Sequence, residues 1–299
     1  MPVRRVYISM PSDFALNRRQ NNLKWAIVKE IEDLGYEAQV FGSSTGGWGL
    51  AAGTSWNLGE VDRVMRRCSG AALIGLPKWR VPFEQRQISL PTEYCHYEGA
   101  VAYTRSLPIL AAVEQGVEPR VVFNWSVGLE IISIPQNAET IWLQSGAFRR
   151  PFETWRRKLE SRRDVFLGYA SSSRGLALNI KRFLTQLEVN TLDWHDDFAP
   201  GRGILDQITE AASRCSGGIF LFTKDDKLDT AGENAIPRDN VVLEAGFFIS
   251  AKGKDRVLVV REKGSKMPAD LGGDIYASLE DKSDIAPIEA SIKAFTANL

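Results

Sequence analysis

The sequence predicts an α/β protein with two tandem domains, each a doubly wound parallel sheet flanked by helices. Short, fully apolar runs alternate with amphipathic helix patterns along the chain, which is typical of parallel strands buried on both faces. The same order of patterns occurs twice, over residues 1–150 and 164–299. The length of 299 residues also suits two domains of about 150 residues each.

The two halves begin in the same way. Apolar runs at 6–9 and 165–168 predict the first strands, and each leads through a Ser-containing loop into a helix pattern. The apolar residues of these helices recur at spacings of four, four and three, at Leu23, Ile27, Ile31 and Leu34 and again at Leu176, Ile180, Leu184 and Leu187. This is the period of a helix with one buried face. The runs 36–41 and 189–194 then predict the second strands.

An Arg-Cys-Ser-Gly sequence ends the next helix pattern in both halves and precedes a buried strand. We expect Gly70 and Gly217 to take the left-handed conformation that ends many helices. Glu98 and Glu244 lie 30 and 29 residues after the cysteines of these two sequences, on helix patterns that lead into apolar strands. The halves are therefore two copies of one βαβαβαβ unit.

Two segments fall outside the shared pattern. The extra length of the first copy lies mostly in a Gly-rich loop at 42–57. An Arg-rich stretch at 149–163 predicts a helix with a solvated face, and we expect the domain boundary near it, at 150–163. Phosphate binding by these arginines is the alternative.

Composition narrows the classes of function. Lys plus Arg and Asp plus Glu are equal at 37 each, so no net charge favours nucleic acid or an anionic membrane. No run approaches the ~20 apolar residues of a membrane span, and the first ten residues lack a signal-peptide pattern. Three cysteines fit reduced thiols, and two histidines do not make a His-built metal site. We expect a cytoplasmic protein without a metal ion.

Glu244 is the first candidate for a functional residue. Its helix is expected to begin near Asp239 as N-cap, and Asn240 lies on the same face one turn earlier. Apolar residues surround the acid on nearly every side, at Val241, Val242, Leu243, Phe247, Phe248 and Ile249. Exposure to solvent is the alternative. A half-buried carboxylate at the mouth of a parallel sheet needs either a partner or a catalytic role.

A Ser-rich turn follows the first strand of the second half. Doubly wound sheets bind ligands outside the carboxyl ends of their strands, and a helix N-terminus with hydroxyls beside it suits a phosphate. Ser171 and Ser172 are therefore candidate phosphate ligands. A simple helix cap explains the same residues as well.

The segment PRDNVVLEAGFFISAKGKDRVLVV at 237–260, with KMPADLGGDIYASLEDK at 266–282, resembles the TIR-like domain of bacterial cyclic-nucleotide-activated antiphage effectors. The resemblance covers residues 164–299 and implies a flavodoxin-like, TIR-like fold. It also implies cleavage of NAD+ at the nicotinamide–ribose bond, with Glu244 as the catalytic glutamate, and NAD+ is then a substrate, with no further cofactor. The family assembles into homo-oligomers, and the loop 195–203, with its turn at Pro200 and Gly201, would complete a neighbouring pocket.

The chemistry of this reaction needs only one acid. Nicotinamide leaves a cationic pyridinium as a neutral molecule, whereas ordinary glycosidases use a second carboxylate to protonate the leaving group. One carboxylate beside the ribose stabilises the developing positive charge. The other candidate ligands of NAD+ are aromatic and polar residues near the carboxyl ends of the strands: Tyr169, Trp194, Phe198, Arg238 and Asn240.

Two of these candidates have structural alternatives. Trp194 ends a strand and suits the core equally well. Arg238 suits either a phosphate or a surface pair with Asp239 or Glu233.

The first half resembles the same family more distantly and shares a glutamate before a Gly/Ala-rich helix with nucleoside deoxyribosyltransferases. The Arg-Asp-Asn triplet is replaced by PTEYCHY at 91–97. We interpret residues 1–150 as a regulatory or assembly domain that binds a nucleotide signal, with a second site at Ser12, Trp48 and Glu98 and with Trp56 nearby. Packing and oligomer contacts alone are the alternative.

The resemblance favours an NAD+ glycohydrolase that yields ADP-ribose or cyclic ADP-ribose and depletes NAD+ in antiphage defence, after activation by a signal or by oligomerisation. An enzyme that makes an ADP-ribose-derived second messenger is an alternative with the same pocket. A non-catalytic nucleotide-binding or scaffold protein is an alternative from another class, and a deoxyribosyltransferase is a more distant one.

Overall fold

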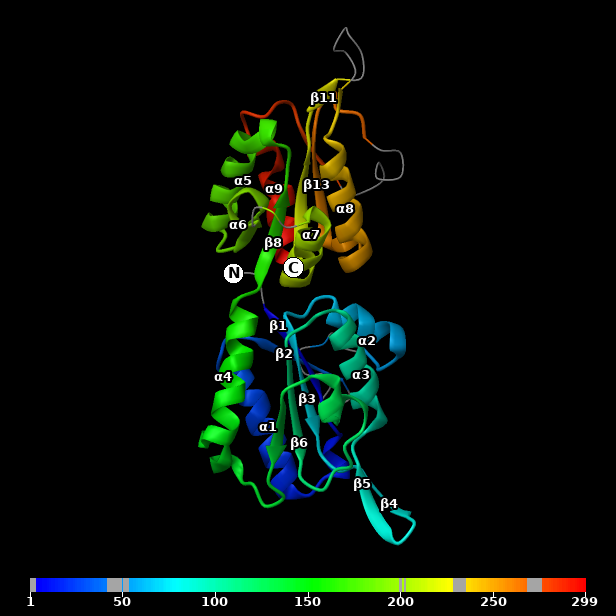
Figure 1. Cartoon of the computed structure of the whole chain (residues 1–299). Coiled ribbons are helices and arrows are strands. Elements are labelled where there is room, and N and C mark those ends of the chain that lie inside the picture. Colours follow the sequence, from blue (N-terminus) through cyan, green and yellow to red (C-terminus); the bar gives the residue numbers. More distant parts are fainter. Residues whose placement is uncertain are drawn as a thin grey trace. The chain divides into compact units, whose positions relative to one another are not determined.

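The computed structural model describes residues 4–41, 50, 54–198, 201, 203–227, 235–267 and 276–299 (Figure 1). Contacts within the chain divide it into two compact units, which in the described part are Arg4–Ser161 and Arg162–Leu299. Both units consist of a parallel sheet with helices on its two faces (Figure 1). No helix in these ranges has both the length and the apolar character needed to cross a membrane.

The sheet of the first unit has five parallel strands in the order β2-β1-β3-β6-β7. The strands are β1 (Arg5–Ser9), β2 (Glu37–Val40), β3 (Gly70–Gly75), β6 (Ile109–Glu114) and β7 (Ile131–Ile134). One face packs on α1 (Arg18–Glu32) and α4 (Gly146–Glu160), and the other on α2 (Leu58–Met65) and α3 (Glu93–Thr104). An antiparallel hairpin, β4 (Trp79–Phe83) and β5 (Arg86–Leu90), follows β3.

The sheet of the second unit has five parallel strands in the order β9-β8-β10-β13-β14. The strands are β8 (Arg163–Gly168), β9 (Thr191–Asp193), β10 (Cys215–Phe222), β13 (Val257–Glu262) and β14 (Tyr276–Leu279). One face packs on α5 (Arg174–Gln186) and α9 (Glu289–Ala297), and the other on α7 (Ile204–Arg214) and α8 (Asp239–Lys252). The remaining elements are α6 (Trp194–Asp197) and a small antiparallel pair, β11 (Asp226–Lys227) and β12 (Ala235–Ile236).

The predicted fold class is confirmed by the strand order. In each unit the second strand is an edge strand beside the first, and the later strands are added on the opposite side of the first. This is the flavodoxin-like order of a doubly wound sheet. Each sheet has one strand more than the repeat predicted, β7 and β14. Both are four-residue edge strands, and β14 alternates exposed and buried residues. Such short edges lack the continuous apolar run that marked the central strands.

The glycines of the two Arg-Cys-Ser-Gly sequences have a different role from the one predicted. Gly70 and Gly217 lie within β3 and β10, and neither has a positive φ. A Cβ on Gly70 would lie 2.3 Å from Leu159 Cδ2, and one on Gly217 would lie 2.6 Å from the carbonyl oxygen of Arg256. The left-handed prediction was wrong: glycine is required here because a neighbouring element packs directly against the strand.

Substituting Gly217 with alanine is expected to destabilise the second unit by about 1–3 kcal/mol, because the new methyl group would overlap backbone that cannot move aside cheaply. Thermal unfolding followed by circular dichroism measures this effect. The matched control is Gly175→Ala in α5, where no atom of the described chain lies within 4 Å of the added Cβ. Equal melting temperatures for the two variants would contradict the packing role.

The Arg-rich stretch forms α4, which belongs to the first unit. Its apolar face is buried in the core at Phe148, Phe152, Trp155 and Leu159. On its polar face, Arg149 pairs with Glu30 of α1 at 2.6 Å. This helix is therefore amphipathic, and the first unit extends to Ser161.

Candidate functional site

Glu244 is the sixth residue of α8, and Glu98 is the sixth residue of α3, so the two acids occupy equivalent places in the two units. The side chain of Glu244 is buried, with 6% exposure. The cap prediction was wrong by one residue: the N-cap is Arg238, one residue before the predicted Asp239, which is instead the first residue of the helix. Asn240 is exposed at the surface.

The apolar residues that surround Glu244 do not all belong to the buried face of α8, and Leu243 is the clearest exception. This side chain is 54% exposed, whereas the adjacent Glu244 is buried. The face in contact with the sheet is formed by Val241, Glu244, Ala245 and Phe248. Sequence composition could not distinguish the two faces because apolar residues surround the helix.

The Glu244 carboxylate lies against Gly168, the last residue of β8. A Cβ on Gly168 would be 2.8 Å from Glu244 Oε2 and 2.5 Å from Phe220 Cδ1. The missing side chain of Gly168 therefore leaves the space that the carboxylate occupies. Within the described chain, Glu244 Oε2 is buried and receives no hydrogen bond.

The surroundings of this carboxylate are aromatic and apolar. Phe166 stacks on Phe248 with ring centroids 5.0 Å apart, and Phe248 meets the edge of Phe220 at 5.3 Å. Burial in this environment raises the pKa of Glu244 to about 7. A carboxyl group that titrates near neutrality at the end of a parallel strand is typical of functional sites.

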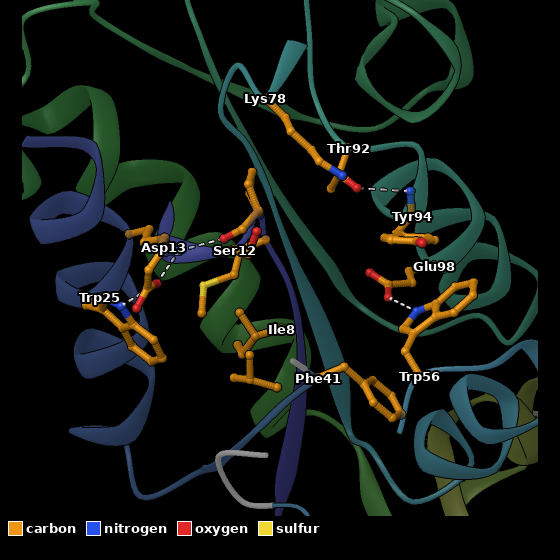
Figure 2. Close-up of a pocket in the computed structure, with 14 residues that line it drawn as sticks. Ile8, Ser12, Asp13, Trp25, Phe41, Trp56, Lys78, Thr92, Tyr94 and Glu98 are labelled. Atoms are coloured by element: carbon orange, nitrogen blue, oxygen red, sulfur yellow. Dashed lines mark hydrogen bonds and ion pairs between the residues drawn. The ribbon is translucent and has the colours of Figure 1, made fainter. Parts of the chain in front are cut away.

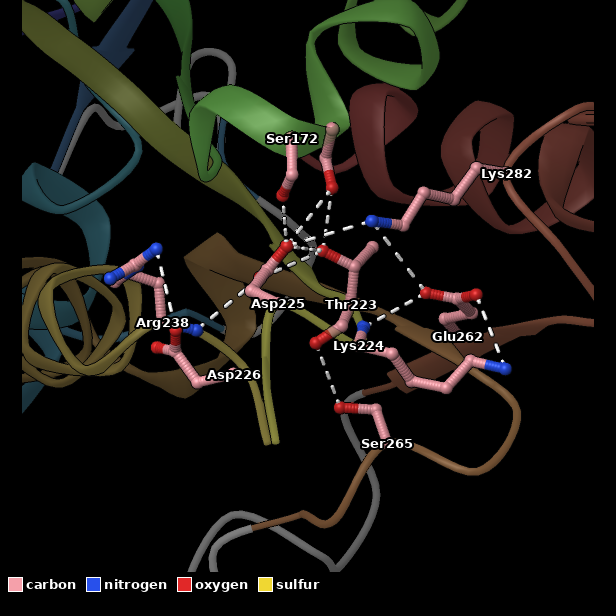
Figure 3. Close-up of polar contacts among 10 residues, drawn as sticks. Ser172, Thr223, Lys224, Asp225, Asp226, Arg238, Glu262, Ser265 and Lys282 are labelled. Carbon is pink, nitrogen blue, oxygen red and sulfur yellow. Dashed lines mark hydrogen bonds and ion pairs between the residues drawn. The ribbon is translucent and has the colours of Figure 1, made fainter. Parts of the chain in front are cut away.

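The Ser-rich turn lies at the same sheet edge and forms η5 (Ser171–Ser173), three residues after Gly168. Ser171 and Ser172 are exposed. Ser172 Oγ donates to Asp225 Oδ1 at 2.5 Å, and Ser173 Oγ hydrogen bonds with Thr223 Oγ1 at 2.6 Å (Figure 3). Ser173 precedes α5 but makes no side-chain cap, so capping does not account for these hydroxyls.

Sequence reasoning missed the acids and cations that these hydroxyls meet. The Asp225 side chain is fully buried and accepts hydrogen bonds from Thr223 Oγ1 at 2.8 Å and from Ser172. Lys282 Nζ lies 3.5 Å from Asp225 Oδ1 and 3.9 Å from Glu262 Oε2, between the two carboxylates (Figure 3). These residues follow or end β10, β13 and β14. The sequence signal that could have identified Asp225 and Glu262 is that each acid lies at or just after the end of an apolar run.

Arg238 pairs with an acid that neither sequence alternative named. Its guanidinium lies 3.3 Å from Asp226 Oδ1 (Figure 3), and its backbone N–H donates to Asp225 Oδ2 at 3.3 Å. Asp239 instead accepts a hydrogen bond from the backbone of Asn240, and Glu233 lies outside the described residues. The Arg238 side chain remains half exposed beside the Asp225 cluster.

The aromatic candidates contribute to the structure of this edge. Tyr169 OH donates to Asp193 Oδ1 at 2.8 Å, and burial together with that carboxylate raises the pKa of Tyr169. Trp194 Nε1 donates to the carbonyl oxygen of Tyr169 at 3.0 Å. Phe198 stacks on Phe166 at 5.9 Å. Trp194 and Phe198 are only partly buried, so each retains some exposed ring surface.

The second candidate site lies in the first unit. Ser12 and Glu98 line one pocket at the carboxyl edge of its sheet. The third residue predicted there, Trp48, lies outside the described residues, as do Pro200 of the loop 195–203 and most of the Gly-rich loop.

Residues 164–281 match the family described as "CAP12/Pycsar effector protein, TIR domain". CD-NTase-associated protein 12 of Lachnospiraceae bacterium (strain RUG226) is 33% identical over 111 residues, which cover 36% of this chain and 35% of that protein. The protein of the same name from Flavobacterium daejeonense is 36% identical over 126 residues, covering 41% and 40%. The Pycsar effector protein BcPycTIR of Burkholderia cepacia is 28% identical over 113 residues, covering 36% and 37%.

The chain thus spans 35% to 40% of the length of these three relatives. The TIR domain of the Toll-related receptor TRR-2 from Hydra magnipapillata matches 44% of this chain and 98% of its own, with 17% identity and a TM-score of 0.34. That score is too low to bear on the fold, which rests on the strand order described above. By its sequence match, the segment 164–281 is similar to the TIR domain of CAP12/Pycsar effector proteins.

Proposed function

We propose that the second unit is an NAD+ glycohydrolase with Glu244 as its catalytic carboxylate. The observation that supports this function most is the state of Glu244, which is a buried acid at the carboxyl edge of the sheet with an oxygen that receives no hydrogen bond in the described chain. The equivalent acid of the first unit differs. Two donors already hold the carboxylate of that acid, because Glu98 Oε1 accepts hydrogen bonds from Tyr7 and Trp56, whereas Glu244 Oε2 receives no hydrogen bond in the described chain and is available to stabilise an oxocarbenium ion.

In the proposed reaction, the bond between C1′ of the ribose and the pyridinium nitrogen breaks, and both electrons stay with the nitrogen. Nicotinamide therefore leaves as a neutral molecule, and the positive charge moves to the ribose. The Glu244 carboxylate stabilises that charge on one face. Water adds to C1′ and releases one proton, which yields ADP-ribose. Attack by an adenine nitrogen of the same molecule would yield cyclic ADP-ribose instead, and product analysis distinguishes the two.

The diphosphate of NAD+ is assigned to the Ser-rich turn at the N-terminus of α5. In the described conformation Ser172 is bound to Asp225, and Lys282 partly neutralises that acid. The hydrogen bond between Ser172 and Asp225 must open before Ser172 can donate to a phosphate oxygen, because a hydroxyl has only one proton to donate. Arg238, which is half exposed beside the turn, is the cation assigned to the phosphates.

The names of the relatives, a CD-NTase-associated protein and a Pycsar effector protein, support a role in signalling. We assign the chain the role of an effector that depletes NAD+ in antiphage defence and is switched on by a nucleotide signal or by assembly into homo-oligomers. The loop 195–203 would complete the pocket of a neighbouring protomer in such an assembly. A catalytic role also accounts for the burial of an acid whose Oε2 receives no hydrogen bond in the described chain, because such burial costs stability and a scaffold does not require it.

The rate of nicotinamide release is expected to follow the ionisation of Glu244. Burial raises its pKa to about 7, so the active carboxylate is lost below that pH. We expect kcat/KM to rise about tenfold per pH unit between pH 5 and 7 and to level above. Chromatography of NAD+ incubated with concentrated protein measures this, and circular dichroism at each pH controls for unfolding. A rate that is highest below pH 6 would exclude the ionised carboxylate.

A further inference from the structure

The pocket of the first unit that Ser12 and Glu98 line has the size of one aromatic ring. It opens at the carboxyl ends of β1, β2 and β3, between α1 and the N-terminus of α3 (Figure 2). Its volume is about 140 Å³, and an engineered apolar cavity of about 150 Å³ binds benzene. The pocket is open on one side, so a longer ligand would insert one end and leave the other at the mouth.

A buried acid forms one wall of this pocket. Glu98 is 5% exposed. Tyr7 OH and Trp56 Nε1 both donate to Glu98 Oε1 at 2.7 Å, while the second carboxylate oxygen faces the interior of the pocket (Figure 2). Two donors on one oxygen hold the carboxylate in place, and the other oxygen is an acceptor for an N–H group of a ligand.

Flat rings form the side walls. Trp25 lies on the α1 side, where its Nε1 donates to Asp13 Oδ1 at 3.2 Å. Tyr94 lies on the α3 side, with its ring centroid 4.3 Å from that of Trp56. Figure 2 shows these rings on opposite sides of the space into which Glu98 points. Such walls suit a planar heterocycle, because bases stack on aromatic side chains.

Two lysines line the pocket, and they differ in their partners. Lys24 is buried, lies 2.7 Å from Asp13 Oδ1 and donates to the carbonyl oxygen of Pro11 at 2.5 Å. Lys78 has no ion pair within the described chain, and its ammonium lies over the rings of Trp79 and Tyr94, at 4.6 and 5.6 Å from their centroids. Lys78 is therefore the cation available to an anionic group of a ligand.

We propose that this pocket is a nucleotide-binding site. The base enters between Trp25 and Tyr94, an N–H on its edge donates to Glu98, and the phosphate meets Lys78 at the mouth. A base supplies a planar ring with an edge donor, and the phosphate supplies the anion, so one ligand class satisfies all three features. The proposal stands on the first unit alone and does not depend on the chemistry of Glu244.

Isothermal titration of the whole chain with AMP, GMP, CMP and UMP tests the proposal. We expect at least one nucleotide to bind, and Glu98→Gln to weaken that binding about tenfold or more. Tyr94→Ala is expected to weaken it about five- to hundredfold through lost stacking. Because Tyr94 is 44% exposed, its truncation leaves the core intact. Lys78→Met should weaken binding of the nucleotide but not of the matching nucleoside.

The control for the charge change is Lys29→Met, an exposed lysine on α1 that pairs with Asp33, and it should leave all affinities unchanged. Ribose 5-phosphate tests the contribution of the base and should bind at least tenfold more weakly. The proposal is overturned if none of the four nucleotides binds at millimolar concentration. It is equally overturned if affinity is unchanged in both Glu98→Gln and Tyr94→Ala, because the nucleotide would then occupy the second unit.

Discussion

Nicotinamide release is expected to fall by about 10²–10³-fold when Glu244 is replaced by glutamine. The amide has the size of the carboxylate but no charge, so it cannot stabilise the positive ribose of the transition state. Chromatography of NAD+ incubated with each protein measures the effect. Glu280→Gln is the matched control, because it makes the same change at a glutamate of the second unit whose side chain is 74% exposed. Equal rates for wild type and Glu244→Gln would remove the proposed catalytic role.

The stability of the same variant provides an independent readout of the buried acid. The pKa of Glu244 is raised from 4.5 to about 7 in the folded state, so the folded protein holds this proton more tightly than the unfolded chain does. The free energy of unfolding therefore falls as the pH rises from 4.5 to 7, by up to about 3 kcal/mol. In Glu244→Gln this part of the pH dependence is absent. Denaturant unfolding at pH 5 and pH 8 compares the two proteins.

The second large effect is expected for Gly168→Ala. The added methyl group would lie 2.5 Å from Phe220 Cδ1 and 2.8 Å from Glu244 Oε2. The ring of Phe220 is held between Phe166 and Phe248, at 5.8 and 5.3 Å, so the carboxylate must move. We expect a loss of about 1–3 kcal/mol in stability. We also expect at least about tenfold lower activity, because small displacements of a catalytic group are costly.

Gly246→Ala is the matched control for this substitution. Gly246 lies on α8 two residues after Glu244, and within the described chain no atom lies within 4 Å of its added Cβ. Alanine there should raise stability by about 0.5–1 kcal/mol, as expected for a helix interior, and leave the rate unchanged. Thermal unfolding and nicotinamide release are measured on both variants. Full activity in Gly168→Ala would show that the position of the Glu244 carboxylate does not depend on the space left by the missing side chain of Gly168.

The sequence alone was sufficient to predict the parallel sheets, the duplication and the equivalence of Glu98 and Glu244. These properties depend on local signals: apolar runs mark strands buried on both faces, and spacings of three and four mark one-sided helices. Leu23, Ile27 and Ile31 are fully buried for this reason. Family resemblance added the match of the second half to a TIR domain.

Only the tertiary structure decided which side chains meet. Asp225 and Lys282 are 57 residues apart in the sequence and lie 3.5 Å apart, and Trp56 and Glu98 meet across 42 residues. No spacing rule connects such pairs, because the order of strands in the sheet brings the loops together. The same holds for the exposure of Leu243 and for the glycines of the Arg-Cys-Ser-Gly sequences. Periodicity determines which face of an element is buried, whereas packing determines what that face contacts.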